Sequence, residues 1–177
     1  MNGSGMHLHQ SLWDGRGKRN LFAVPSKEDL SGLARSYVAG ILEHAHALSA
    51  LVSPTVNSYK RLKPFFEAPT TVAWGRSNRS SMIRVPKTGG GSAGKRIEMR
   101  CPDPSCSPHL AIAAIMAAGL DGIERELTPA DLVENNLFED SRDVRHLPQS
   151  LADALEHLKR DTALRDALDA DTIYTVI

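Results

Sequence analysis

The sequence predicts an α+β fold, in which strands and helices occupy different parts of the chain. One long helical pattern, over residues 30–48, is followed by short strand-like stretches bounded by Pro and Gly, and helical patterns fill the last third. The 177 residues are 41% hydrophobic and 24% charged, a composition typical of one globular domain.

Charge and apolar content exclude several classes of protein. The 21 Lys+Arg residues balance 21 Asp+Glu residues, so no long-range field attracts nucleic acid or an anionic membrane. The longest apolar run, residues 110–120, is far shorter than the roughly 20 residues that span a bilayer. Two cysteines, Cys101 and Cys106, are too few for a disulfide framework. We therefore expect a cytoplasmic protein that binds neither nucleic acid nor membranes.

The first elements follow from alternation and periodicity. Residues 6–12 alternate as a strand, which places His7 and His9 on one face. Residues 14–17 contain two glycines and predict a turn. Ser26 with Asp29 predicts the start of a helix whose apolar positions recur at helical spacing as far as Leu48.

Short strands and then helices follow. The strand-like stretches are residues 55–62, 70–74, 81–85 and 96–101. Ser107 and Pro108 predict the start of a helix that is apolar on every side, and therefore buried all round. Further helices are expected from Thr128 and from Ser150, with a charged loop over residues 139–145 between them.

A strand around Glu98 carries the most informative charges. Alternation places Arg96, Glu98 and Arg100 on one face of it. A solvated outer face is the simpler interpretation of such a strand. Four more arginines lie among the neighbouring short strands: Arg61, Arg76, Arg79 and Arg84. Because arginine captures carboxylates and phosphates, a carboxylate among arginines suggests a metal or an anionic substrate nearby.

Two metal sites are conceivable. His7 and His9, together with Glu98, would give a mixed nitrogen and oxygen site that suits Mn²⁺ or partly hydrated Mg²⁺. A zinc site from the two histidines with Cys101 and Cys106 is the competitor. It is less favoured, because Cys101 should face the side of its strand opposite Glu98.

The glycine-rich segment 89–95 has the glycine and lysine spacing of a phosphate-binding loop. Such a loop needs Ser or Thr next, and then a helix. Arg96 and a strand follow instead, so a flexible loop is the better interpretation.

Five segments in this order resemble the glutamine synthetase family. They are residues 2–9 (NGSGMHLH) with 11–12 (SL), 57–69 (NSYKRL to EAP), 76–86 (RSNRS to IRVP), 96–100 (RIEMR) and 102–122 (PDPS to AAGLDG). The resemblance implies a curved antiparallel sheet, part of a barrel-like catalytic domain, with flanking helices. It also implies a ligase of glutamine biosynthesis that uses ATP and Mg²⁺ or Mn²⁺ to join glutamate and ammonia through γ-glutamyl phosphate.

The resemblance assigns a role to each matching residue. It makes His7 and Glu98 ligands of the metal, and Glu67 and Arg79 the catalytic residues, with Glu67 on a flap over the acyl-phosphate. The glutamate-binding residues it implies are Asn2, Gly3, Arg61, Glu67, Arg79 and Arg100. The ATP-binding residues it implies are His9, Ser11, Arg79, Arg84 and Arg96. Phosphoryl transfer depends on charge neutralisation and alignment, which suits an arginine cluster beside a metal.

Two departures leave alternatives open. Phe65 and Phe66 follow Pro64 where the family usually has glycine, and Ser107 and His109 replace Asn and Tyr. A larger amine or a polyamine is therefore an alternative to ammonia.

A larger departure is what the 177 residues omit. We expect sequence before Asn2 and after Ile177, because the N-terminal β-grasp domain and the early catalytic strands that the resemblance implies are not among these residues. The chain then corresponds to a strand-rich site region, 1–106, and a helical part, 107–177. The family's homo-oligomeric ring is expected of the full-length parent. A non-catalytic truncated product that retains nucleotide or glutamate binding is the remaining alternative, and exposed sheet edges predict aggregation.

Overall fold

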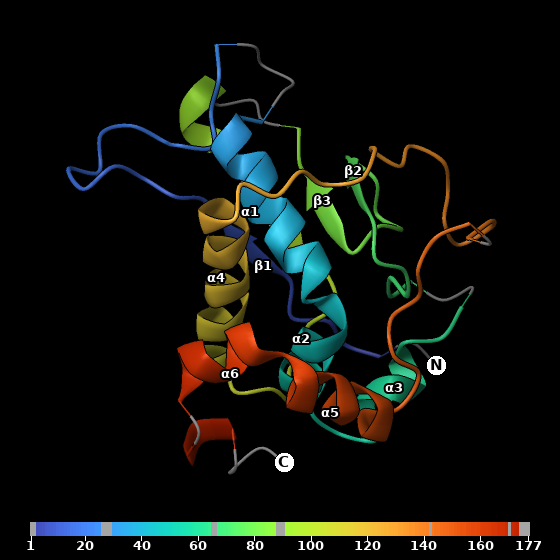
Figure 1. Cartoon of the computed structure of the whole chain (residues 1–177). Coiled ribbons are helices and arrows are strands. Elements are labelled where there is room, and N and C mark those ends of the chain that lie inside the picture. The colour runs from blue at the N-terminus through green and yellow to red at the C-terminus, as the bar shows by residue number, and fades with distance from the viewer. Residues whose placement is uncertain are drawn as a thin grey trace.

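The computed structural model describes residues 3–25, 30–64, 67–87, 91–141, 143–169 and 171–173. The fold is α+β, as the sequence predicts (Figure 1). The elements in chain order are β1 (Leu8–Gln10), α1 (Gly32–Glu43), α2 (Ala45–Val52), α3 (Ser58–Arg61), β2 (Trp74–Arg76), β3 (Ile83–Val85), a 3₁₀ turn (Gly91–Gly94), β4 (Ile97–Met99), α4 (Pro108–Glu124), α5 (Leu151–Arg160) and α6 (Thr162–Leu168).

The four strands form one small open sheet in the order β1-β4-β3-β2. β4 pairs antiparallel with both β1 and β3. The expectation of an antiparallel sheet is wrong for one pair, because β2 and β3 run parallel. The strand with Glu98 thus lies between two antiparallel neighbours, which bring their side chains beside its own.

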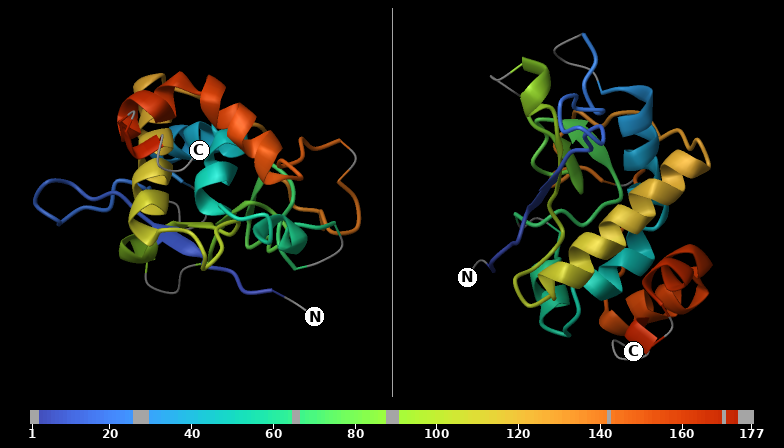
Figure 2. Two further views of the ribbon diagram at one scale, coloured as in Figure 1. Left: turned by 90° about the horizontal axis from the view of Figure 1, so that it is seen from below. Right: turned by 90° about the vertical axis from the view of Figure 1, so that its left-hand side faces the viewer.

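Helices cover one face of this sheet and leave the other face open (Figure 2). The apolar side chains of Ile83, Ile97 and Met99 are fully buried beneath the helices. Tyr37 of α1 lies in the same core, where its hydroxyl donates to Gln10 Oε1 at 2.7 Å. The alternation of each strand therefore separates a packed face from a face that carries the charges.

Two helices at the centre of the helical layer, α1 and α4, cross at glycines. A Cβ on Gly40 would lie 2.1 Å from the carbonyl oxygen of Ala118, and a Cβ on Gly122 would lie 2.2 Å from that of Ser36. Such distances are closer than any Cβ contact allows, so the two backbones touch only because both positions lack side chains.

The long helix predicted for residues 30–48 starts later and is divided. α1 begins after Ser31, whose hydroxyl accepts from the amide of Ala34, while the predicted cap at Ser26 and Asp29 lies outside the described residues. The helix breaks at His44, and α2 follows directly. The predicted caps at Ser107 and Ser150 are confirmed.

Three other predictions of local structure are wrong. Residues 55–62 contain the short helix α3, because Thr55 and Ser58 exchange side-chain and backbone hydrogen bonds that start a helical turn. No helix starts at Thr128, where the chain runs irregularly beside β2 and the amide of Val133 donates to the carbonyl of Trp74 at 3.0 Å. α4 is not buried all round, since Ile112 is 50% exposed.

No described helix combines the length and the apolar character needed to cross a membrane.

Candidate active site

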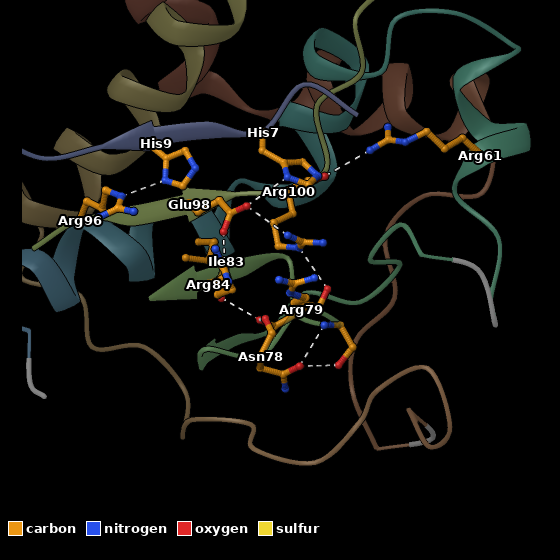
Figure 3. Close-up of polar contacts among 12 residues, drawn as sticks. His7, His9, Arg61, Asn78, Arg79, Ile83, Arg84, Arg96, Glu98 and Arg100 are labelled. Carbon is orange, nitrogen blue, oxygen red and sulfur yellow. Dashed lines mark hydrogen bonds and ion pairs between the residues drawn. The ribbon is translucent and has the colours of Figure 1, made fainter. Parts of the chain in front are cut away.

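The register of the sheet aligns three of the predicted residues in one row. His9 on β1 lies opposite Glu98 on β4, and Glu98 lies opposite Arg84 on β3. Residues opposite each other in antiparallel strands point to the same face of the sheet. The row therefore gathers an imidazole, a carboxylate and a guanidinium on the face that the helices leave open (Figure 3).

Glu98 is the centre of this site. Its side chain is only 3% exposed and contacts Arg84 Nε, Arg100 Nη1 at 3.1 Å and His7 Nδ1 at 3.0 Å. Burial by itself raises the pKa of a carboxyl group, but Arg84, then Arg100 and His7, outweigh this and lower the pKa of Glu98. The buried carboxylate is therefore charged, and arginines stabilise the charge.

The pKa of both histidines of the site is lowered, which favours the neutral form. Burial, followed by the positive charge of Arg100, lowers the pKa of His7. Burial likewise lowers the pKa of His9, with Arg96 as a further cause. Arg96 Nε donates to His9 Nδ1 at 3.1 Å, which leaves that nitrogen as an acceptor. Neutral imidazole is the form that ligates metals.

His7 and Glu98 fit as two ligands of Mg²⁺ or Mn²⁺. Their donor atoms, an imidazole nitrogen and a carboxylate oxygen, lie together at 3.0 Å, and both kinds of donor suit these ions. The residues described here contain no group of three or more His, Cys, Asp and Glu side chains that could hold a metal. The pair is therefore a partial ligand set.

The alternative zinc site does not form among the described residues. Cys101 is buried, and burial raises the pKa of its thiol to about 12. Burial also raises the pKa of the Cys106 thiol. Thiols that remain protonated are poor zinc ligands. Cys101 also lies just beyond the end of β4, where it belongs to the hydrophobic core.

Arg61 joins the site from α3. Its guanidinium donates to the carbonyl oxygens of Cys101 at 2.9 Å and Arg100 at 3.2 Å, just after β4. Gly3 packs against its aliphatic stem, since a Cβ there would lie 3.3 Å from Arg61 Cδ. A Cβ on Gly5 would lie 3.1 Å from His7 Nε2, so this glycine-rich entry runs close to the site. Asn2 lies outside the described residues.

The remaining predicted residues make few or no contacts with the cluster. Arg79 is exposed, and its carbonyl accepts from Arg100 Nε at 3.0 Å. Ser11 Oγ accepts from Trp13 Nε1 at 3.0 Å. Glu67 is exposed, and within the described part of the chain no hydrogen bond or ion pair joins it to the cluster. Its role on a flap stays a prediction.

Two asparagines that the sequence did not single out hold the loops around the site. Asn78 Nδ2 donates to the carbonyl oxygens of Val133 and Asn135, which fixes the turn that carries Arg79. Asn20 is 5% exposed, and its Nδ2 donates to the carbonyl oxygen of Lys95 at 2.7 Å. The sequence carries only a weak signal for these two roles. Each asparagine lies next to a predicted turn or loop, where a side-chain amide often forms hydrogen bonds with the backbone.

The arrangement suits an anionic ligand. The face carries the guanidinium groups of Arg61, Arg79, Arg84, Arg96 and Arg100 around one charged carboxylate, Glu98. Arginines in excess over carboxylates attract phosphate or carboxylate groups and stabilise charge that develops during transfer.

Comparison with known sequences identifies the family. The family model described as glutamine synthetase, catalytic domain, matches residues 1–177. The glutamine synthetase of Thermus thermophilus is 48% identical over 183 residues, which cover 99% of this chain and 40% of that protein. The glutamine synthetase of Pyrococcus furiosus is 50% identical over 173 residues, which cover 94% of this chain and 38% of that protein.

Two solved structures are also similar to this chain in fold and in sequence. A structure named "Apo GmaS without ligand" matches with a TM-score of 0.87 and 38% identity, over 98% of this chain and 39% of that one. A second, named "GmaS/ADP complex-Conformation 1", has the same TM-score of 0.87 at 37% identity, over 98% of this chain and 41% of that one. The chain spans about two fifths of the length of these relatives. It belongs to the glutamine synthetase family, as part of the catalytic domain.

Proposed function

We propose that this chain is part of a cytoplasmic ligase that uses ATP to join ammonia to the side-chain carboxylate of glutamate. The observation that carries the proposal is the buried Glu98 carboxylate between Arg84, Arg100 and the neutral His7. Family membership supports the reaction class, and the arginine-rich face supports two anionic substrates, ATP and glutamate.

The proposed reaction has two steps. A γ-carboxylate oxygen of glutamate attacks the γ-phosphorus of ATP, so a P–O bond forms while the bond to the ADP oxygen breaks. Ammonia then attacks the acyl carbon of γ-glutamyl phosphate, inorganic phosphate leaves, and a proton is lost. The amide product is glutamine.

Each residue of this chain has one task in the proposal. Arg61 and Arg100 hold the glutamate with Asn2 and Gly3, and Arg79, Arg84 and Arg96 hold the phosphates with His9 and Ser11. Glu67 excludes water and accepts the ammonium proton. His7 and Glu98 would hold Mg²⁺ or Mn²⁺, which when bound neutralises phosphate charge. The ligands they do not supply would come from the rest of a full-length protein, which would assemble as a ring.

Calorimetric titration of the 177-residue chain with ATP and Mn²⁺ tests the binding part of the proposal. We expect heat of binding from the wild type and at least tenfold weaker binding from Arg84→Gln, because a cation on the phosphates is lost. Arg160→Gln, an exposed change on α5, is the control. A folded wild type that releases no heat would contradict any nucleotide-binding role.

Larger amines are the second candidate, because Phe65 and Phe66 replace the glycine of the family's flap. Phosphate release by the full-length parent with ammonia, methylamine and a polyamine separates the two. Faster release with an amine than with ammonia would reject ammonia as the preferred substrate.

A further inference from the structure

Residues 12–21 form a hairpin arm that extends away from the helices and the sheet (Figure 1). Its turn is closed by hydrogen bonds from the amide of Gly17 to the carbonyl of Asp14 at 2.8 Å and from the amide of Asp14 to the carbonyl of Arg19 at 3.0 Å. The Asp14 carboxylate accepts from the amide of Lys18 at 2.8 Å, and Gly17 has a φ of 63°. These contacts give the arm a defined shape.

The arm is cationic at its tip and aromatic at its base. Arg16, Lys18 and Arg19 are exposed, and among the described residues no carboxylate lies within ion-pair distance of them. Asp14 is the single acidic residue of the arm. Trp13, at the base of the arm, is 41% exposed. Three cations and a tryptophan on a projecting hairpin are suited to an acidic surface with an apolar floor.

Such a surface lies elsewhere on the same chain. A groove of about 540 Å³ is lined by the end of α1, by residues 72–74, and by residues 127–131, 133 and 143–145. Its floor contains the apolar side chains of Leu42, Val72 and Trp74. Neither the arm nor the residues of the candidate active site line it.

The rim of the groove is acidic. Glu43, Asp131 and Asp143 line it and are exposed. Arg145 is the one cation among the lining residues described, and its guanidinium donates to the carbonyl oxygen of Leu42 at 2.6 Å, at the end of α1. Further exposed acids lie in the neighbouring segment: Glu124, Glu126, Glu134, Glu139 and Asp140.

The arm and the groove face away from each other on one molecule. Figures 1 and 2 both show the arm projecting on one side of α1 and α4, while β2 and the irregular segment after α4 lie on the opposite side. The arm therefore cannot reach the groove of its own chain. A second copy presents the same groove to it.

We propose that the arm of one copy of this chain docks in the acidic groove of a second copy. Arg16 and Lys18 meet the rim carboxylates of Asp131 and Asp143, and opposite charges guide the approach. The contact joins two different surfaces, so it is heterologous and repeats from copy to copy. Since Asn20 fixes the arm to the segment before β4, little flexibility is lost on docking.

Analytical ultracentrifugation of the 177-residue chain over a range of concentrations tests the contact. We expect the wild type to self-associate, and the association to weaken as salt rises, because the contacts are ionic. The double variant Arg16→Glu with Lys18→Glu reverses the charge of the arm. The double variant Asp131→Lys with Asp143→Lys reverses the charge of the groove. Each double variant alone should associate at least tenfold more weakly than the wild type.

A mixture of the two double variants gives the sharpest result. In the mixture the natural arm of the groove variant meets the natural groove of the arm variant, and the reversed arm meets the reversed groove. Both contacts then pair opposite charges, so the mixture should associate although each variant alone does not. Lys159→Glu with Arg160→Glu, which makes the same charge change on exposed positions of α5, should associate like the wild type.

Three results would overturn the proposal. They are a wild type that stays monomeric at all concentrations, a control that loses association as the arm variant does, and a mixture that does not associate although both variants are folded by circular dichroism. The test does not involve ATP or glutamate, so its outcome is independent of the proposed ligase activity.

Discussion

At the scale of single residues, burial and neighbours decide which side chains are charged. His44, 6% exposed, lies between two carboxylates: its Nδ1 is 2.6 Å from Asp161 and its Nε2 is 2.9 Å from Asp121. Burial alone would lower its pKa, but the hydrogen bonds to both carboxylates outweigh this and raise the pKa above the ordinary 6.5. Arg125 also contacts Asp121, at 2.8 Å. The side chain of His44 thus ties the α1–α2 junction to α4 and to Asp161, the residue just before α6, and the raised pKa favours its protonated form.

This geometry predicts how stability depends on pH. Because the folded pKa of His44 is raised, its contribution is fully present below about pH 6.5 and is lost as pH rises through the folded pKa. Urea unfolding between about pH 6 and pH 9 should show this loss. His44→Gln should unfold about 2 kcal/mol more easily near pH 6, since it loses hydrogen bonds to charged groups.

His109→Gln, an exposed change at the start of α4, is the matched control and should retain the pH dependence of the wild type. Equal pH dependence in the wild type and in His44→Gln would contradict the role of His44.

At the scale of elements, the crossing of α1 and α4 depends on missing side chains. Glycine lowers helix stability by about 1 kcal/mol relative to alanine, so Gly40, Gly119 and Gly122 weaken the helices that contain them. A Cβ on Gly119 would lie 2.2 Å from the Tyr37 ring, and one on Gly122 would lie 2.5 Å from the Gly40 nitrogen. Close packing between α1 and α4 offsets the helix stability that the glycines lose.

We expect Gly122→Ala to destabilise the fold by about 2 kcal/mol, although alanine favours helix. The added methyl group meets backbone atoms, which cannot move aside as a flexible side chain can. Gly32→Ala at the start of α1 is the control, because nothing lies within 4 Å of its added Cβ, and it should be neutral or slightly stabilising. Urea unfolding of the two variants and of the wild type measures each change in the free energy of unfolding. If both variants are as stable as the wild type, the proposed helix contact is wrong.

At the scale of the whole molecule, one face of α4 exposes a row of large apolar side chains to solvent. Ile112, Met116 and Leu120 follow one another at four-residue spacing on α4 and are 50%, 45% and 46% exposed. β1 and β2 are the edge strands of the described sheet. Exposed apolar stripes and sheet edges promote association between molecules.

Replacing Ile112, Met116 and Leu120 with Gln should therefore reduce aggregation of the isolated chain, as measured by light scattering on heating. The free energy of unfolding should change by less than about 1 kcal/mol, because these side chains are half-exposed and make few contacts to lose.

Val56→Gln is the control, since Val56 is 70% exposed and lies outside this stripe. If the triple variant aggregates as strongly as the wild type, the sheet edges rather than α4 cause aggregation. High salt should not weaken association through α4, which distinguishes it from docking of the arm.

Local patterns predicted well those features that depend on a few neighbouring residues. Ser107 and Ser150 cap helices because a serine before an apolar periodic segment can accept the free amides of the first turn. The same patterns failed where a distant contact decided the outcome. Residues 128–131 have the signature of a helix start, yet the carbonyl of Ala130 accepts from Trp74 Nε1 and the segment stays irregular.

The sequence by itself determined the fold class, the family, and which side chains share a face, because alternation along a strand and the order of motifs are local properties. Only the tertiary structure decided that β1, β4 and β3 pair in the register that places His9, Glu98 and Arg84 in one row. It also decided that His44 meets two carboxylates and that one face of α4 stays exposed. Periodicity states which residues point together, whereas pairing and packing depend on contacts between residues far apart in the chain.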